Sequence, residues 1–201
     1  MSLNSNALTT LAVAKDYLDI LSSDTSQDSR VERMINAASD MIERYTSRKI
    51  KQQSITEYHD GKHSNRLVLR EWPALKPSEI KVDSGWVFDS TSVWSTDTYD
   101  IERDSVVILK YGTVFPKGSR NIKVTYQGGY ATVPSAIEEA CLIIVQWLDG
   151  LRTDRRVGVK SKSKGGENVS FEAEMPAVAK GILEPFIRIE FPESERSTTN
   201  V

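Results

Sequence analysis

The sequence predicts an α+β protein, mainly a helical bundle with an inserted antiparallel β-rich subdomain and an extended C-terminal arm and tail. Apolar residues recur three or four positions apart near both ends of the chain, which is typical of amphipathic helices. In the middle, short β-branched segments alternate with turn residues, which is typical of strands. The 201 residues, 39% of them hydrophobic, fit one domain with an elaboration and a slightly lean core.

This pattern divides the chain into four regions. Residues 1–49 form the N-terminal helices of the bundle, and residues 50–127 form the inserted β-rich subdomain. Residues 128–188 supply a central helix, an arm and a C-terminal helix that complete the bundle. Residues 189–201 are expected to be a flexible acidic tail, since the segment EFPESERSTTNV is polar and carries several glutamates.

The first helix is expected to begin after Thr9 or Thr10, because a threonine hydroxyl can cap the free backbone N–H groups of a helix start. Its apolar residues recur at helical spacing as far as Leu21. The polar segment SSDTSQDS then forms a linker to the next helix.

The second helix is the clearest in the chain. Asp28 or Ser29 can cap it, and apolar residues from 31 to 45 form one stripe at helical spacing. Charged residues, Glu43 among them, occupy the other face and are expected to face solvent.

Residues 50–127 predict a small antiparallel sheet or barrel. The segment ITEYHDGKHSNRLVLR predicts a β-hairpin with Gly61 in its turn and with Leu67 and Leu69 on one face. Four further strands are predicted from SEIKVD, TYDIERD, SVVILKYG and NIKVTYQG.

A sharp strand-to-helix joint follows at VTYQGGYATVPSAIEE. Gly128 and Gly129 can present N–H groups to a phosphate, but neither of the known glycine-rich phosphate-binding patterns is present. We therefore expect a structural hinge in which glycine supplies a positive φ. The helix begins at Pro134 or Ser135, continues through the apolar run CLIIVQWL, and is expected to be central and to end at Gly150.

The next stretch is basic and shows no periodicity, so it predicts an extended arm or a loop. Two interpretations remain open: a solvated loop, or an arm that contacts an acidic partner or the phosphates of DNA. Its cations are Arg152, Arg155, Arg156, Lys160, Lys162 and Lys164. A last helix is predicted from Ala177 to about Ile187, with Val178 on its apolar side and Pro185 kinking or ending it.

No pattern of catalytic or metal-binding residues is evident. His59 and His63 share a strand-and-turn segment without a suitable third ligand, and Cys141 lies among apolar residues without a base to activate it. We therefore expect no catalytic residues, no metal, no cofactor and no enzymatic activity. The lone cysteine fits a reducing compartment, and neither a secretory signal nor a membrane span is expected. Trp86 and Trp94 flank a polar loop and are candidates for a subunit contact.

The order of elements resembles that of the head–tail connector (adaptor) proteins of tailed bacteriophages. The start LTTLAVAKDYLDI, the joint VTYQGGYATVP, the apolar helix IEEACLIIVQWL and the final MPAVAKGILEPFIRI carry the resemblance, which covers most of residues 8–188. The strands between 50 and 127 make this chain long for the group.

The resemblance implies a structural role at the head–tail interface of a virion, with synthesis in the host bacterial cytoplasm. It implies a homo-oligomeric ring, typically of twelve subunits, that binds the portal protein and a stopper or tail-completion protein. Double-stranded DNA passes through the lumen of such a ring without specific contacts. In similar proteins the C-terminal segment enters the portal, and here its apolar contacts would be Ile182, Phe186, Ile187, Ile189 and Phe191.

Other functions compete with this one. The basic arm at 152–164 allows a nucleic-acid-binding module, although a net charge of −2 is unfavourable for a molecule that binds DNA electrostatically as a whole. Another head-completion or tail-joining protein of similar size is a neighbour of the connector hypothesis. An enzyme built on the β-rich region would need a pocket with perturbed titratable groups, which the sequence does not show.

Overall fold

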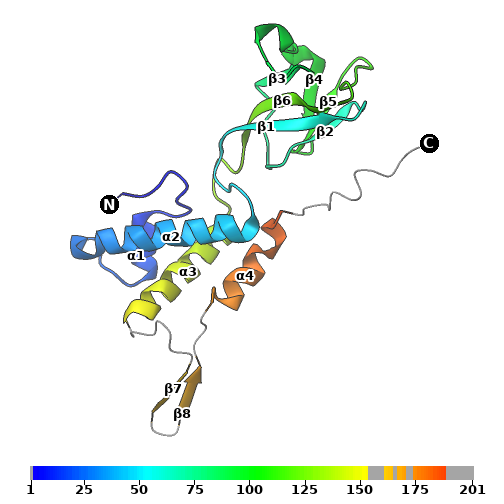
Figure 1. Cartoon of the computed structure of the whole chain (residues 1–201). Coiled ribbons are helices and arrows are strands. Elements are labelled where there is room, and N and C mark those ends of the chain that lie inside the picture. Colours follow the sequence, from blue (N-terminus) through cyan, green and yellow to red (C-terminus); the bar gives the residue numbers. More distant parts are fainter. Residues whose placement is uncertain (1, 154–160, 165–166, 171–173, 189–201) are drawn as a thin grey trace. The chain divides into compact units, whose positions relative to one another are not determined.

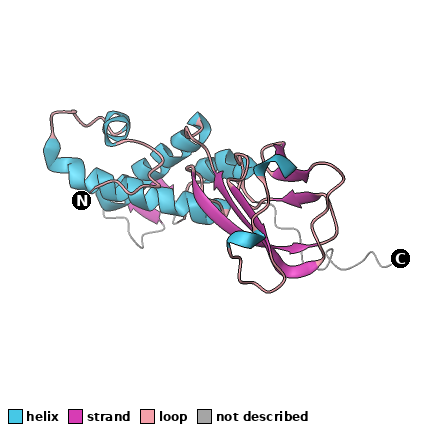
Figure 2. Ribbon diagram, turned by 90° about the horizontal axis from the view of Figure 1, so that it is seen from above, coloured by secondary structure: helices cyan, strands magenta, loops and turns pink. Residues whose placement is uncertain are grey.

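The protein is α+β and forms two compact units (Figures 1 and 2). The computed structural model describes residues 2–153, 161–164, 167–170 and 174–188. Residues 1–48 and 133–201 make one unit, here called the helical unit, and residues 49–132 make the other, here called the β unit. Within the described residues, no helix is both long enough and apolar enough to cross a membrane.

The helical unit is organised around α3 (Ser135–Thr153). This helix packs against α1 (Leu11–Tyr17), α2 (Asp28–Thr46) and α4 (Ala177–Leu183) (Figure 1). Its central position, expected from the run CLIIVQWL, is confirmed by six buried apolar side chains: Ile137, Ala140, Cys141, Leu142, Ile144 and Val145. Burial of this kind contributes roughly 1.5–3 kcal/mol for each large aliphatic side chain.

The α1 helix ends earlier than its apolar pattern suggests. Thr10 caps its start as expected, its hydroxyl accepting a hydrogen bond from the Val13 N–H at 3.3 Å. Leu21, however, lies beyond the helix and is 75% exposed. The buried ammonium of Lys15 donates to the carbonyls of Ser22 and Asp24 and pairs with Asp28 at 2.7 Å. These bonds turn the chain away from the helix axis, so the prediction that Leu21 extends the helical stripe is wrong.

Two expectations for α2 are also corrected. Neither Asp28 nor Ser29 caps it, because the N-cap is Gln27 and makes no side-chain capping bond, while Asp28 is already helical and pairs with Lys15. Glu43 is buried rather than solvated, and it accepts a hydrogen bond from Asn6. The chain before α1 therefore covers part of the face that the charged pattern assigned to water.

The α3 helix does not end at Gly150 but continues to Thr153. A methyl group added at Gly150 would meet nothing within 4 Å, so this glycine occupies an open position on the helix surface. After α3, the segments β7 (Ser161–Lys164) and β8 (Glu167–Ser170) pair as antiparallel strands, whereas the sequence predicted an arm or a loop for β7.

The C-terminal helix is shorter than predicted. The α4 helix ends at Leu183 and is followed by the 3₁₀ turn η4 (Glu184–Phe186), which contains Pro185. The expected break at this proline is confirmed, since proline has no N–H to continue an α-helix. Val178 was expected on the apolar side of the helix, but it is 65% exposed.

The β unit consists of two three-stranded antiparallel sheets. The first has the order β1-β6-β3 and the second the order β2-β5-β4. Their bounds are Gln53–Gly61 for β1, Arg66–Val68 for β2, Glu79–Val82 for β3, Tyr99–Glu102 for β4, Val106–Leu109 for β5 and Gly118–Gly128 for β6. Inward side chains form one core of Leu67, Leu69, Ala74, Ile80, Tyr99, Val107, Leu109, Phe115, Ile122, Val124 and Tyr126.

The predicted hairpin around Gly61 does not form. The strand β1 pairs with β6, with Thr56 opposite Thr125, while β2 pairs with β5. Gly61 is the last residue of β1 and lies opposite Gly118. A Cβ there would lie 1.8 Å from the Pro116 carbonyl oxygen, so this glycine is required by a close approach of backbones.

At the predicted glycine hinge, the expected positive φ is found at Gly129 but not at Gly128. Gly128 ends β6, whereas Gly129 has φ of 99° and donates its N–H to the Pro73 carbonyl at 2.9 Å. The next residue, Tyr130, donates to the Ile50 carbonyl at 2.7 Å. The two chain segments through which the chain enters and leaves the β unit are thus hydrogen-bonded to each other.

We predict that Gly129→Ala destabilises the β unit by about 1–3 kcal/mol, the usual cost of a strained backbone position. A Cβ there would lie 2.7 Å from the Lys51 carbonyl oxygen, at a φ that alanine disfavours. Gly150→Ala is the matched control and is expected to stabilise the helical unit by up to about 1 kcal/mol. Urea unfolding followed by circular dichroism measures both, and equal effects of the two substitutions would contradict the assignment.

Candidate interaction surfaces

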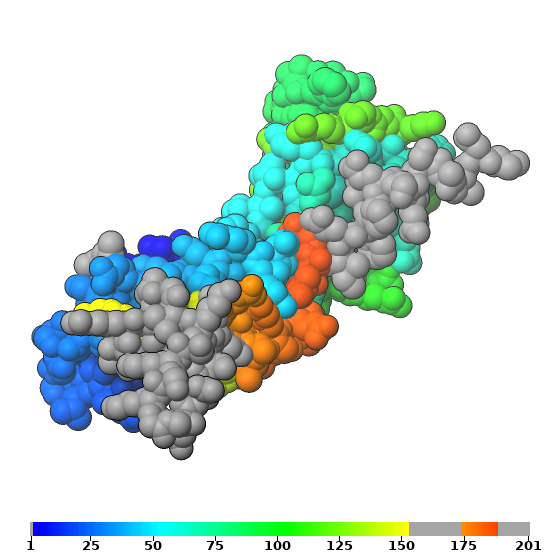
Figure 3. All heavy atoms as spheres, turned by 60° about the horizontal axis from the view of Figure 1, so that its bottom comes forward, coloured from blue at the N-terminus to red at the C-terminus, as the bar shows by residue number. Residues whose placement is uncertain are grey.

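The loop after β3 is held in shape by one carboxylate. Asp83 accepts hydrogen bonds from the N–H groups of Gly85, Val87 and Phe88 at 2.7, 2.9 and 2.9 Å. The bonds from Phe88 and Gly85 hold the pKa of this carboxyl below its ordinary value. The loop, which continues into η2 (Ser90–Ser92), lies at the surface of the β unit (Figure 3).

This loop presents aromatic side chains from unusual backbone positions. Trp86 and Phe88 have φ of 61° and 50°, a region that costs non-glycine residues about 1–3 kcal/mol each. Trp86 is 62% exposed, and its indole N–H donates to the Ser119 carbonyl at 2.9 Å. The rings of Phe88 and Tyr58 form a T-shaped pair with centroids 5.5 Å apart and an interplanar angle of 63°. The strain is offset by the bonds to Asp83, so the tryptophan is held outward in a fixed position.

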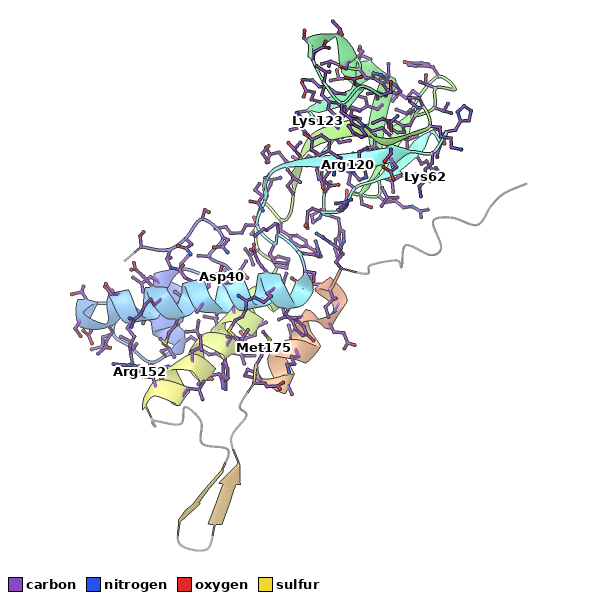
Figure 4. The ribbon with its side chains drawn as sticks, viewed as in Figure 1. Asp40, Lys62, Arg120, Lys123, Arg152 and Met175 are labelled. Atoms are coloured by element: carbon purple, nitrogen blue, oxygen red, sulfur yellow. The ribbon has the colours of Figure 1, made fainter. Side chains whose placement is uncertain are left out.

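Basic side chains adjoin these aromatics. The Arg120 guanidinium lies over the Tyr58 ring, 5.5 Å from its centroid. Lys123 of β6 lies opposite Tyr58 of β1 in the register of the two strands. Figure 4 labels Lys123, Arg120 and Lys62 on the β unit. Lys62 and Lys117 are exposed next to the paired ends of the same strands at Gly61 and Gly118. We call the set Tyr58, Lys62, Trp86, Val87, Phe88, Lys117, Arg120 and Lys123 the basic-aromatic face.

The two tryptophans predicted to form a subunit contact lie in different environments. Trp86 belongs to the basic-aromatic face. Trp94 stacks on Phe115 with centroids 5.5 Å apart and an interplanar angle of 3°, and it packs against the core. Its side chain therefore has a structural partner within the β unit, and Trp86 is the better placed of the two for an external contact.

The predicted basic arm is described only in part. Arg152 is exposed near the end of α3 (Figure 4). Lys162 and Lys164 belong to β7, opposite Val169 and Glu167 of β8. Arg155, Arg156 and Lys160 lie outside the described residues.

The predicted portal-binding segment starts from a fixed point. The Arg48 guanidinium donates to the Phe186 carbonyl at 3.2 Å, and the Arg188 N–H donates to the Thr46 carbonyl at 2.9 Å. Ile182, Phe186 and Ile187 are half-buried. Ile189 and Phe191 lie outside the described residues. The end of α2 thus holds the chain as far as Arg188.

A buried network of hydrogen bonds around Glu57 stabilises the β unit. Glu57 accepts hydrogen bonds from the Tyr126 hydroxyl at 2.5 Å and the Arg70 N–H at 3.2 Å, and its other contact is the His59 ring at 2.8 Å. Burial would raise the pKa of the Glu57 carboxyl, but the bonds from His59 and Tyr126 outweigh it and hold the pKa below its ordinary value. Burial raises the pKa of the Tyr126 hydroxyl, which donates to Glu57 and accepts from the Glu71 N–H.

Other candidate reactive groups are similarly occupied. Burial raises the pKa of the Cys141 thiol to about 12, so it is not a nucleophile near neutral pH. Among the residues that the structure describes, no three His, Cys, Asp or Glu side chains are grouped to hold a metal ion. His59 faces Glu57, and His63 is exposed.

Sequence reasoning singled out Trp86 but missed the other residues that build the basic-aromatic face. Asp83 is followed by Ser84 and Gly85, a signal for an Asx-type turn that predicts a fixed loop. The alignment of Tyr58 with Lys123 depends on the pairing of β1 with β6, which the predicted local hairpin excluded.

Three solved structures have a similar fold over almost the whole chain. One, described as the neck of an empty GTA particle computed with C6 symmetry, has a TM-score of 0.60 and 12% identity, and the match covers 96% of this chain and 95% of that one. A virion of a native gene transfer agent has a TM-score of 0.61 and 14% identity, and the match covers 96% of this chain and 95% of that one. The native GTA neck computed with C12 symmetry has a TM-score of 0.56 and 13% identity, and the match covers 96% of both chains. No curated protein sequence matches the chain.

The match of most of the chain to a head completion family model, together with the fold shared with the GTA neck structures, places the protein in the class of phage head–tail connector proteins. A family model described as head completion protein matches residues 7–189, and the chain belongs to this family. The resemblance to connector proteins drawn from the sequence is confirmed. The family is a structural one of the virion.

Asp83→Ala is predicted to release the loop that carries Trp86. The N–H bonds of Val87 and Phe88 to the Asp83 carboxylate protect these amides in the wild type, so without the carboxylate their hydrogens should exchange at least about tenfold faster. Hydrogen exchange measured residue by residue tests this. Ser84→Ala, one position along the loop, is the control and should leave both rates unchanged. Unchanged rates in Asp83→Ala would show that the carboxylate does not hold the loop.

Glu57→Gln is predicted to make the unfolding free energy of the β unit depend less on pH between pH 7 and pH 3. Because the folded pKa of Glu57 lies below its ordinary value of 4.5, its ionisation stabilises the fold above that pH, and this contribution is lost as pH falls through the folded pKa. At pH 7 the variant should be about 1–3 kcal/mol less stable. Unfolding free energies between pH 7 and pH 3 measure the difference, with Glu79→Gln on the solvent side of the same sheet as control. Parallel curves for wild type and Glu57→Gln would contradict this role.

Proposed function

We propose that the protein acts without catalysis, as one subunit of a homo-oligomeric ring that docks under the portal, continues the DNA channel and receives the stopper or tail. The observation that carries the proposal is the fixed start of the C-terminal segment at Thr46 and Arg48. Because the chain is anchored as far as Arg188, the segment that follows starts from a defined point, as a docking segment must. That segment begins with Ile189, Glu190 and Phe191, which supply apolar and acidic side chains.

The likeness to neck structures supports a ring. One of the similar structures is a native GTA neck computed with C12 symmetry, which is a property of that particle. A ring of twelve subunits is the corresponding proposal for this chain. An interface that joins two different surfaces of neighbouring copies is the kind that closes into such a ring when the rotation per subunit matches.

The charge of the chain suits a channel through which DNA slides. A formal charge of −2 for each subunit disfavours tight binding of phosphates to the assembly as a whole. Weak, non-specific contact with double-stranded DNA follows from this balance. A nucleic-acid-binding function centred on residues 152–164 would instead require a strongly salt-dependent affinity of the isolated chain for duplex DNA.

Deleting residues 189–201 is predicted to abolish binding to the portal protein while leaving the helical unit folded, because the contacts of Arg48 and Thr46 with Phe186 and Arg188 remain. The matched control deletes residues 196–201 and keeps Ile189 and Phe191. Co-sedimentation with purified portal measures binding, and circular dichroism verifies folding. Normal portal binding by the longer deletion would overturn the assignment of this segment.

A further inference from the structure

We propose that the basic-aromatic face of the β unit binds the acidic segment of residues 16–24, the end of α1 and the loop that follows it, in the helical unit of a second copy of this chain. The proposal rests on the ring proposed above and assigns one of its interfaces. It joins two unlike surfaces, so each copy can bind one neighbour through its face and another through its acidic segment.

The two units carry opposite net charge. The β unit contains twelve Lys and Arg against ten Asp and Glu, whereas the helical unit contains fourteen against eighteen. Contacts between like units of two copies are therefore electrostatically disfavoured, and contacts between unlike units are favoured. This polarity selects a head-to-tail pairing of copies over a symmetric one.

The basic-aromatic face is built in advance of binding. The bonds from the Asp83 loop and from the Trp86 indole to Ser119 fix the apolar side chains, with Trp86 62% and Val87 74% exposed. Arg120 is held by its contact with Tyr58 and by its N–H bond to Asp60 at 2.6 Å. Groups fixed before association lose little conformational entropy on binding, which is how a small face gains affinity.

The acidic segment of residues 16–24 matches this face in chemistry. Asp16 and Asp19 are exposed, and Leu21 between Asp19 and Asp24 is 75% exposed. The buried Lys15 ammonium fixes the loop through the Ser22 and Asp24 carbonyls at 3.1 and 2.8 Å. An exposed leucine among three aspartates can pack on Trp86 and Val87 while the carboxylates meet Arg120 and the lysines.

Duplex DNA fits the face less well than a polypeptide does. Trp86 and Val87 would be left against a phosphate backbone that offers no apolar partner. An acidic segment that also carries an apolar side chain satisfies both parts of the face.

Disulfide trapping between two variants tests the proposal. Leu21→Cys and Val87→Cys are made separately, one with a mass tag, and mixed under mild oxidation. The native Cys141 does not interfere, because it is buried with its pKa raised to about 12. We expect the mixed disulfide to form about tenfold faster than either homodimer, the lower end of the range for electrostatically steered association. Equal rates for the three dimers would overturn the proposal.

A charge-reversal pair supplies the control. Arg120→Glu with Lys123→Glu in the Val87→Cys chain should remove the preference, and Asp16→Lys with Asp19→Lys in the Leu21→Cys chain should restore it. A preference that survives the first pair of changes would overturn the electrostatic assignment. Salt-dependent binding of duplex DNA to the wild type that is lost with the first pair, without a trapping preference, would assign the face to DNA instead.

The outcome is separable from that of the proposed connector function. Portal co-sedimentation of the Arg120→Glu, Lys123→Glu variant is measured in parallel. If the variant still binds portal and the disulfide trapping shows no preference, the connector role is retained and this interface alone is contradicted. If the wild-type chain does not bind portal, the connector role itself is contradicted.

Discussion

Burial of the apolar residues of α3 is the interaction on which the helical unit depends. This helix contacts α1, α2 and α4, so removing its side chains from water is what holds segments more than a hundred residues apart together. Polar contacts then fix the arrangement: Thr9 donates to Glu138 at 2.9 Å, and Arg30 pairs with Asp149 at 2.7 Å. Such partly buried hydrogen bonds and ion pairs are directional, so they select one orientation of the helices among several that bury the same area.

The β unit solves a different problem, since its sheets are small and its strands short. Its two longest strands, β1 and β6, pair with each other over most of their length. On the inner face of that pair, hydrogen bonds to Glu57 take the place of aliphatic packing. A buried carboxylate is costly unless its hydrogen bonds are satisfied, and here the Tyr126 hydroxyl and the Arg70 N–H satisfy it. The outer face is then free to carry charged and aromatic side chains.

Local patterns predicted the helices and several strands well, and they failed where distant segments decided the outcome. Helical spacing found α2 and α3, and turn residues bounded β3 to β6, because these signals act within a few residues. The prediction of a hairpin at Gly61 was wrong because a glycine is needed there by the close approach of the Pro116 backbone, which is far along the chain, and not by a local turn. Glu43 was assigned to solvent because the preceding chain, which covers it through Asn6, leaves no periodic signal. Of the candidate surfaces, Trp86 was found by its polar surroundings, while Arg120 and Lys123 depended on unpredicted register.

The bond from Tyr130 to the Ile50 carbonyl has an evolutionary consequence. Because the segments that enter and leave the β unit are hydrogen-bonded to each other, the two ends of this insert lie side by side, whatever the size of the insert. Such a module can be enlarged, trimmed or exchanged among relatives without altering the scaffold that receives it. The surface of the β unit can therefore change along with its binding partner while the helical unit stays constant.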